Sequence, residues 1–183
     1  DLHLSLRRQR QMCIRDRYKS NSKLNIEFSL NGKNISTETN NRTLLSDFIR
    51  HNIGETGTHV GCEHGICGAC TVLLNGEPIR SCLMFASQLN GHDLVTVEGL
   101  SNDDDFIHLR EAFKRNHALQ CGFCTPGFLI TISSFLKTDP NSANENDIRE
   151  ILSGNICRCT GYVGIVNAVK EVIENKKNRH KDA

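Results

Sequence analysis

A ten-residue loop rich in cysteine and glycine constrains this chain more than any other segment. It reads Gly61-Cys62-Glu63-His64-Gly65-Ile66-Cys67-Gly68-Ala69-Cys70. Glycine accepts positive φ angles and close backbone approach, so such a loop is able to wrap tightly around a compact group. The spacing Cys-x4-Cys-x2-Cys, followed by a distant cysteine, is the plant-type pattern by which four thiolates hold a [2Fe–2S] cluster. The loop therefore predicts a site for an iron–sulfur cluster.

The position of the fourth thiolate follows from one turn. Asn75-Gly76 separates two short segments of strand-forming residues and is a strong signal for a two-residue β-hairpin. Such a hairpin sets residues 70 and 81 opposite each other, so the next cysteine returns to the end of the hairpin where the loop lies. We therefore expect one cluster to be bound by Cys62, Cys67, Cys70 and Cys82.

The composition indicates metal ligands rather than disulfides. Nine cysteines occur in 183 residues, in tight groups with metal-ligand spacing, and no secretory signal is visible. No apolar run approaches the length needed to span a bilayer, so we expect a cytoplasmic protein with no transmembrane segment. The formal net charge of +1 gives no electrostatic reason to expect nucleic acid as a partner.

Residues 1–22 differ in character from the rest of the chain. The first part of this segment contains many arginines, no hydrophobic periodicity and an isolated Cys13. We expect residues 1–22 to be either a disordered leader or a foreign segment introduced by a sequence-assembly artefact. Without Cys13, eight cysteines remain, and they divide into two sets of four.

Residues 23–99 carry the signals of strands, turns and one crossing helix. The expected elements are a strand over 24–30, a second strand through Ile35, a helix capped by Thr43 and ending near Gly54, the hairpin after the cluster loop, a short helix over 83–89 and a strand over 93–97. This order predicts a mixed sheet crossed by a helix, which is the β-grasp arrangement of plant-type ferredoxins.

Beyond a boundary that three consecutive aspartates mark within residues 99–105, the apolar residues recur with the helical period of 3.6. The expected helices cover residues 106–117, 126–137, 144–153 and 162–175. Four short helices predict a compact helical domain over residues 100–176. The basic residues from Lys176 to Lys181 predict a solvated or frayed tail within residues 177–183.

A second set of cysteines lies between these helices. Cys121 and Cys124 precede the second helix, and Cys157 and Cys159 precede the fourth. In both places a threonine follows the cysteine pair at an expected N-cap, so the positive ends of both helices would point toward the thiolates. Structural zinc is the rival reading, and the sequence leaves it more open for this second set than for the first.

Three blocks together resemble the small iron–sulfur subunit of the molybdenum hydroxylases, the family of xanthine oxidase and aerobic carbon monoxide dehydrogenase. The resemblance covers residues 23 to about 175 and depends on residues 61–72 around the first cysteines, Gln120-Cys121-Gly122-Phe123-Cys124-Thr125-Pro126-Gly127 and Cys157-Arg158-Cys159-Thr160-Gly161-Tyr162. It implies an α+β protein with an N-terminal β-grasp ferredoxin-like domain followed by a C-terminal four-helix [2Fe–2S]-binding domain. The second cluster would be bound by Cys121, Cys124, Cys157 and Cys159.

The resemblance also implies a role and partners. A large subunit would hold molybdopterin and carry out the hydroxylation, and a medium subunit would hold FAD. This chain would relay electrons from molybdopterin to FAD through its two clusters and contribute no catalytic residue. Gln120, which precedes Cys121, would hydrogen-bond the pterin.

Two other functions stay open from the residues alone. A free two-cluster ferredoxin would carry electrons without a molybdenum partner, and a zinc-stapled interaction module would carry none. The substrate of the complex also stays open, because selectivity lies in the large subunit: carbon monoxide, a purine, another N-heterocycle and an aldehyde are all compatible with this sequence.

Overall fold

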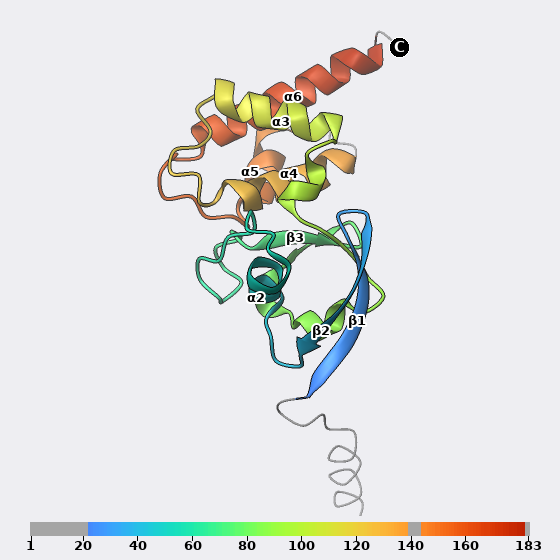
Figure 1. Cartoon of the computed structure of the whole chain (residues 1–183). Coiled ribbons are helices and arrows are strands. Elements are labelled where there is room, and N and C mark those ends of the chain that lie inside the picture. Colours follow the sequence, from blue (N-terminus) through green and yellow to red (C-terminus); the bar gives the residue numbers. More distant parts are fainter. Residues whose placement is uncertain (1–21, 139–143, 182–183) are drawn as a thin grey trace, which may run out of the picture.

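Five strands form one mixed sheet in the order β2-β1-β5-β3-β4 (Figure 1). β1 (Lys23–Leu30) pairs antiparallel with β2 (Lys33–Asn40) and parallel with β5 (Asp93–Val95). β3 (Thr71–Leu74) pairs antiparallel with both β5 and β4 (Glu77–Arg80). The computed structural model describes residues 22–138 and 144–181. The expected mixed sheet with two hairpins is confirmed, and its second strand runs five residues beyond the predicted end.

The helix that crosses the sheet has an unexpected form. α2 (Leu45–Asp47) is a single α-helical turn that continues directly as the π-helix η1 (Phe48–Ile53). Gly54 ends it at a positive φ of 92°, as the sequence predicts. The predicted N-cap at Thr43 is wrong: Leu44 occupies that position, and the Thr43 carbonyl instead accepts a hydrogen bond from the backbone of Ala86.

Three short 3-10 segments follow the second hairpin, two before β5 and one after it. They are η2 (Ser81–Leu83), η3 (Ala86–Leu89) and η4 (Val97–Leu100). The single helix predicted over 83–89 is wrong, because the backbone is extended at Met84 and its carbonyl accepts a hydrogen bond from Leu45 N–H at 2.8 Å. The strand predicted over 93–97 ends at Val95.

Four helices make the second half of the molecule, as the periodicity predicts. They are α3 (Asp104–Arg115), α4 (Thr125–Lys137), α5 (Glu145–Leu152) and α6 (Val163–Lys181). In Figure 1 they lie at one end of the molecule and the sheet lies at the other, with β3 next to α4. None of the helices in residues 22–138 and 144–181 is long and apolar enough to cross a bilayer.

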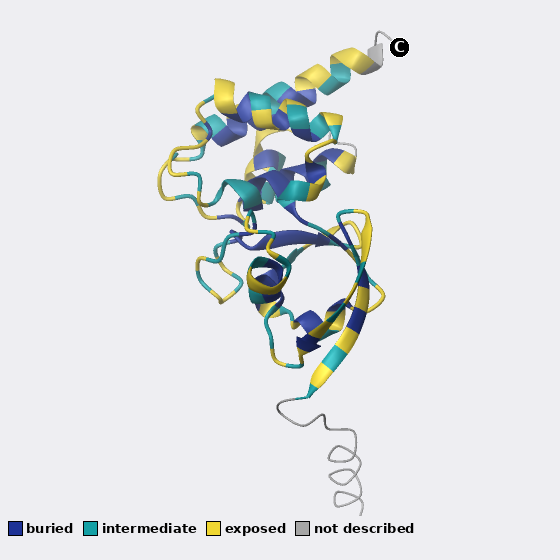
Figure 2. Ribbon diagram, viewed as in Figure 1, coloured by how far each residue is buried: buried dark blue, intermediate teal, exposed yellow. Residues whose placement is uncertain are grey.

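Each half has its own apolar core, visible as the dark segments in Figure 2. The sheet core packs Phe28 against Phe48, with their ring centroids 6.0 Å apart, and is closed by η1. The helical core is centred on Phe113 and Phe128 and also includes Leu73 from β3. Because Leu73 belongs to the helical core, the sheet and the helices share one interface. The division at residues 99 and 100 stays a prediction.

The helix starts differ from the predicted caps near the second cysteine set. Cys124, and not Thr125, occupies the N-cap of α4, with Pro126 in the first turn. α6 begins at Val163, three residues after Thr160. Both threonine N-caps are therefore wrong, although the N-terminus of α4 does coincide with one of its cysteines.

The basic segment at the C-terminal end is helical and not frayed. α6 continues through Lys181, and its residues 178 and 179 are exposed, as expected of a solvated segment. The Lys176 ammonium donates hydrogen bonds to the Asp105 carboxylate and to the Leu136 carbonyl, both at 2.8 Å, and Arg179 reaches the same carboxylate at 3.3 Å. The predicted leader with Cys13 lies outside the described residues, apart from Ser22, and so do residues 182 and 183.

Candidate metal centres

The first centre, defined as Cys62, Cys67, Cys70 and Cys82, is assembled as the hairpin predicts. Thr71 pairs with Arg80 across the turn, and Ser81 N–H donates to the Cys70 carbonyl at 3.3 Å. Residues 70 and 81 therefore lie opposite each other, which brings Cys82 to the loop. The Cys82 thiol interacts with that of Cys70, and the Cys67 thiol interacts with that of Cys62.

Backbone N–H groups of the loop point at the sulfur of Cys62. The N–H groups of Cys67 and His64 lie 3.4 Å and 3.3 Å from that sulfur. These two donors lower the pKa of Cys62 to about 6. An N–H group stabilises a thiolate more than a thiol, so this part of the loop is built for a deprotonated sulfur.

The side of the first centre formed by Cys70 and Cys82 is less polar. Cys70 and Cys82 are buried, and burial, followed by the hydrogen bond from Cys70, raises the pKa of Cys82 to about 11. A buried thiolate needs positive charge beside it, and a bound metal supplies that charge. Gly68, at a φ of +72°, lies so close to the helical half that a Cβ atom there would lie 2.6 Å from the Gly154 carbonyl.

The second centre, defined as Cys121, Cys124, Cys157 and Cys159, lies at the ends of the helices. The sulfurs of Cys121 and Cys159 are 3.5 Å apart, and Cys124 and Cys157 share a side-chain hydrogen bond. Burial raises the pKa of Cys124 to about 12, and the interaction with Cys157 is the second-largest cause of this shift. Cys121 and Cys159 are exposed, so this centre has an open side and a closed side.

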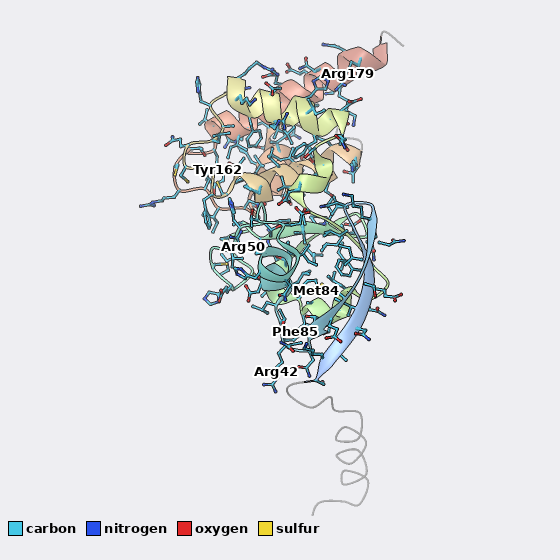
Figure 3. The ribbon with its side chains drawn as sticks, viewed as in Figure 1. Arg42, Arg50, Met84, Phe85, Tyr162 and Arg179 are labelled. Atoms are coloured by element: carbon cyan, nitrogen blue, oxygen red, sulfur yellow. The ribbon has the colours of Figure 1, made fainter. Side chains whose placement is uncertain are left out.

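Cys157 differs from Cys124 because it receives polar donors. Burial alone would raise the pKa of Cys157, but donors from Thr160 and Cys159 outweigh it and the pKa is lowered. The Thr160 hydroxyl donates to the Cys157 sulfur at 3.2 Å, and Cys157 N–H donates to the Tyr162 hydroxyl at 2.9 Å. Tyr162, labelled in Figure 3, then donates to the Asn155 carbonyl at 3.1 Å and packs edge-on against Phe128.

All eight thiols are free and lie in four close pairs, two pairs in each centre. Electrostatic interactions of Cys82 with Cys62, and of Cys124 with Cys121, show that the two pairs of a centre are neighbours. In residues 22–138 and 144–181, no three His, Cys, Asp or Glu side chains converge on a single-ion site. Each centre thus contains two neighbouring pairs of sulfurs.

A polar junction joins the two centres. Ile156 N–H donates to the Cys67 carbonyl at 2.9 Å, and the buried Asn155 amide donates to the Gly68 carbonyl at 2.9 Å. Arg80 donates to the Thr71 hydroxyl at 2.6 Å and also to the Gly154 carbonyl. Sequence reasoning missed Asn155, Arg80, Thr160 and Tyr162, because these contacts depend on packing between the halves or on the loop conformation.

Gln120 lies at the exposed side of the second centre. Its amide nitrogen donates to the Cys159 carbonyl at 3.0 Å. The residue is exposed, so it is accessible from outside the chain. The predicted contact of Gln120 with a pterin stays a prediction.

Two family models match the chain in succession. The model described as "2Fe-2S iron-sulfur cluster binding domain" matches residues 28–97, and the model described as "[2Fe-2S] binding domain" matches residues 96–170. Each half of the fold thus corresponds to one iron–sulfur domain type.

Curated relatives and solved structures agree with these models. The chain is 52% identical to caffeine dehydrogenase subunit gamma of Pseudomonas sp. (strain CBB1), over 80% of this chain and 89% of the relative. It is 48% identical to the nicotine 6-hydroxylase small subunit of Paenarthrobacter nicotinovorans, over 80% and 88%. Quinoline 2-oxidoreductase from Pseudomonas putida 86 superposes with a TM-score of 0.79 at 44% identity, over 85% of this chain and 97% of that chain.

The residues fit the cofactor that these comparisons indicate, because paired thiols with N–H donors are what a [2Fe–2S] cluster requires. The resemblance found in the sequence is therefore confirmed. The chain belongs to the small iron–sulfur subunits of the molybdenum hydroxylases, which transfer electrons within an oxidoreductase complex and do not catalyse its reaction alone.

Proposed function

We propose that the eight paired thiols bind two [2Fe–2S] clusters and that electrons pass from the second centre to the first. When bound, each cluster accepts and releases one electron. The observation that carries the assignment is the pairing of the thiols, because four cysteines on a [2Fe–2S] cluster divide as two on each iron. Structural zinc would instead require four ligands around one ion. Cys62 with Cys67 and Cys70 with Cys82 would each bind one iron of the first cluster.

The hydrogen bond from Ile156 to Cys67 supports a direct route between the centres. Ile156 immediately precedes Cys157, and the acceptor carbonyl belongs to Cys67 itself. One hydrogen bond and a short covalent segment therefore link a ligand of one centre to a ligand of the other. Asn155 is 1% exposed, and its amide donates to the Gly68 carbonyl, so a buried side chain holds the same junction.

We propose that a molybdopterin-binding large subunit covers the second centre and that an FAD-binding medium subunit covers the first. Apolar side chains are exposed around both centres: Phe123 is 49% and Val163 60% exposed near the second, and Ile66 and Leu83 are each 63% exposed near the first. Exposed apolar groups beside a functional site are typical of surfaces that a partner covers. Gln120, exposed at the second centre, would then face the pterin.

The relatives favour an N-heterocycle as the substrate of the complex. The names of the three similar proteins described above refer to caffeine, nicotine and quinoline, at identities of 52%, 48% and 44%. An aldehyde oxidoreductase subunit of Escherichia coli (strain K12) is 38% identical. We therefore propose hydroxylation of an aromatic N-heterocycle by the large subunit. We also propose a cytoplasmic location, since free thiols such as these persist in a reducing compartment.

A pair of ligand variants tests the assignment in the purified complex. Two [2Fe–2S] clusters predict about four irons per chain and two distinct EPR signals after reduction. Cys121→Ser should remove one signal and stop electron flow from substrate to acceptor, and Cys62→Ser should remove the other signal, so each variant serves as the control for the other. Unchanged turnover in Cys121→Ser would contradict the relay.

The alternatives predict different results from the same preparation. A free two-cluster ferredoxin would purify without a molybdenum-containing partner and would still exchange electrons with other proteins. A zinc-stapled module would be colourless and would contain zinc instead of iron.

A further inference from the structure

Thr160 makes a contact with the second centre that the pattern of cysteines does not require. Its hydroxyl lies 3.2 Å from the Cys157 sulfur. The same hydroxyl oxygen accepts a hydrogen bond from Tyr162 N–H, also at 3.2 Å. Because a metal-bound thiolate has no proton to donate and the oxygen already accepts from Tyr162, the hydroxyl proton is directed at the sulfur.

The loop around Thr160 is held in the conformation that this contact needs. Gly161 and Tyr162 both have positive φ angles, 62° and 69°, which reverse the chain just before α6. A non-glycine residue in this region is uncommon, and the Tyr162 hydroxyl compensates by bonding Cys157 N–H and the Asn155 carbonyl. Figure 3 shows this tyrosine in the helical half of the molecule. The backbone conformation of this loop thus places the Thr160 hydroxyl beside the Cys157 sulfur.

The related threonine of the same centre provides an internal comparison. Thr125 follows Cys124 as Thr160 follows Cys159, although Pro126 comes after the first threonine and Gly161 after the second. Thr125 begins α4, and within residues 22–138 and 144–181 its hydroxyl makes no hydrogen bond to a sulfur. Within the same described residues, Thr160 is the residue whose side-chain hydroxyl donates a hydrogen bond to a cysteine sulfur. The two threonines of the second centre therefore differ: the Thr160 hydroxyl contacts a cysteine sulfur, and the Thr125 hydroxyl does not.

We propose that the Thr160 hydroxyl raises the reduction potential of the second centre by donating a hydrogen bond to the Cys157 sulfur. The inference rests on the proposed assignment of Cys157 as a cluster ligand. Reduction adds one electron and one negative charge to the centre, and a hydrogen bond strengthens as its acceptor becomes more negative. Hydrogen bonds to the sulfurs are among the features that set the potentials of such clusters. Thr160 is a positioning residue for electron transfer and does not itself react.

The test is an EPR-monitored redox titration of the purified complex, with dithionite as reductant and mediator dyes. Thr160→Val keeps the shape of the side chain and removes the donor. We expect the equilibrium constant for reduction of the second centre to fall about tenfold, which is about 59 mV for a one-electron couple. The first centre should keep its potential and serves as the reference inside the same sample. Cys157→Ser identifies which signal belongs to the second centre.

Three variants separate the hydrogen bond from a change in packing. Thr160→Ser keeps the hydroxyl and should keep the wild-type potential, and Thr125→Val should leave both potentials unchanged. Thr160→Ala removes the donor with less bulk, and a shift in the same direction as for Thr160→Val would support the inference.

Three results would overturn it. The first is an unchanged potential in Thr160→Val with both EPR signals intact. The second is a potential in Thr160→Ser that is lowered as much as in Thr160→Val. The third is loss of the second centre's signal in both Thr160→Val and Thr160→Ala, which would mean that Thr160 is needed for cluster assembly. Failure of the proposed function would look different from failure of this inference, because the wild-type complex itself would then not show two iron-dependent EPR signals.

Discussion

Replacing Asn155 by alanine tests the polar junction between the two centres most sharply. Asn155 is 1% exposed, and its amide group makes two hydrogen bonds to other elements. Nδ2 donates to the Gly68 carbonyl at 2.9 Å, and Oδ1 accepts from the Thr131 hydroxyl at 3.0 Å. The side chain thus joins the first cluster loop to α4 from a position two residues before Cys157.

The expected loss of unfolding free energy in Asn155→Ala depends on whether the former partners of Asn155 keep other hydrogen bonds. The Gly68 carbonyl also accepts from the Thr71 hydroxyl, and Thr131 also reaches the Gly127 carbonyl, so neither partner is left without a bond. Each lost hydrogen bond then costs about 1 kcal/mol, and the small cavity adds about 1 kcal/mol. The total of about 3 kcal/mol lowers the midpoint of thermal unfolding by about 6–12 °C for a chain of this size.

Circular dichroism at a fixed scan rate measures this shift, with the iron content determined on the same samples. Asn178→Ala is the matched control, because Asn178 is exposed on α6 and away from both centres; it should change the midpoint by less than about 2 °C. If Asn155→Ala unfolds at the wild-type temperature with its full iron content, the junction does not contribute to stability and the reasoning fails.

Two further predictions concern the same framework. Gly127→Ala should lower the yield of folded, iron-containing protein, because a Cβ at that position would overlap the Gly68 carbonyl; Gly91→Ala, where no atom lies within 4 Å but φ is positive, should retain both EPR signals. At Asp105, burial raises the pKa, but the hydrogen bond from Lys176 and the charges around it outweigh burial and lower it. This carboxylate therefore stabilises the fold at pH values above its ordinary pKa of 3.8, and the contribution is lost as the pH falls through its lower folded-state pKa. Asp105→Asn should destabilise the protein at pH 7 and change its stability least at the acid end of the range, as unfolding at several pH values would show; equal destabilisation at every pH would contradict the ion pair with Lys176.

Local turn chemistry explains why much of the first centre was predictable. Asn75-Gly76 forces a two-residue hairpin, and the observed pairing of Thr71 with Arg80 follows from that turn alone. The helices were equally accessible, because their apolar periodicity survives in the structure as buried faces. The hairpin turn and the helical periods were therefore predictable from neighbouring residues, whereas the exact N-caps at Thr43, Thr125 and Thr160 were not.

Predictions failed where distant parts of the chain decide the local structure. The backbone of Thr43 pairs with Ala86, so the helix starts one residue later than its sequence indicates. Asn155 contacts Gly68 across 87 positions, and no sequence period reports such a contact. Thr125 and Thr160 each follow a cysteine pair, but Pro126 follows the first and Gly161 the second; Thr125 begins α4, whereas positive φ angles follow Thr160.

The number of iron atoms and of reduced-state EPR signals in the anaerobically purified complex tests the account most directly. Two centres of four thiolates each predict about four irons per chain and two signals that disappear separately in Cys62→Ser and Cys121→Ser. Zinc in place of iron, or a single signal that neither substitution removes, would contradict it.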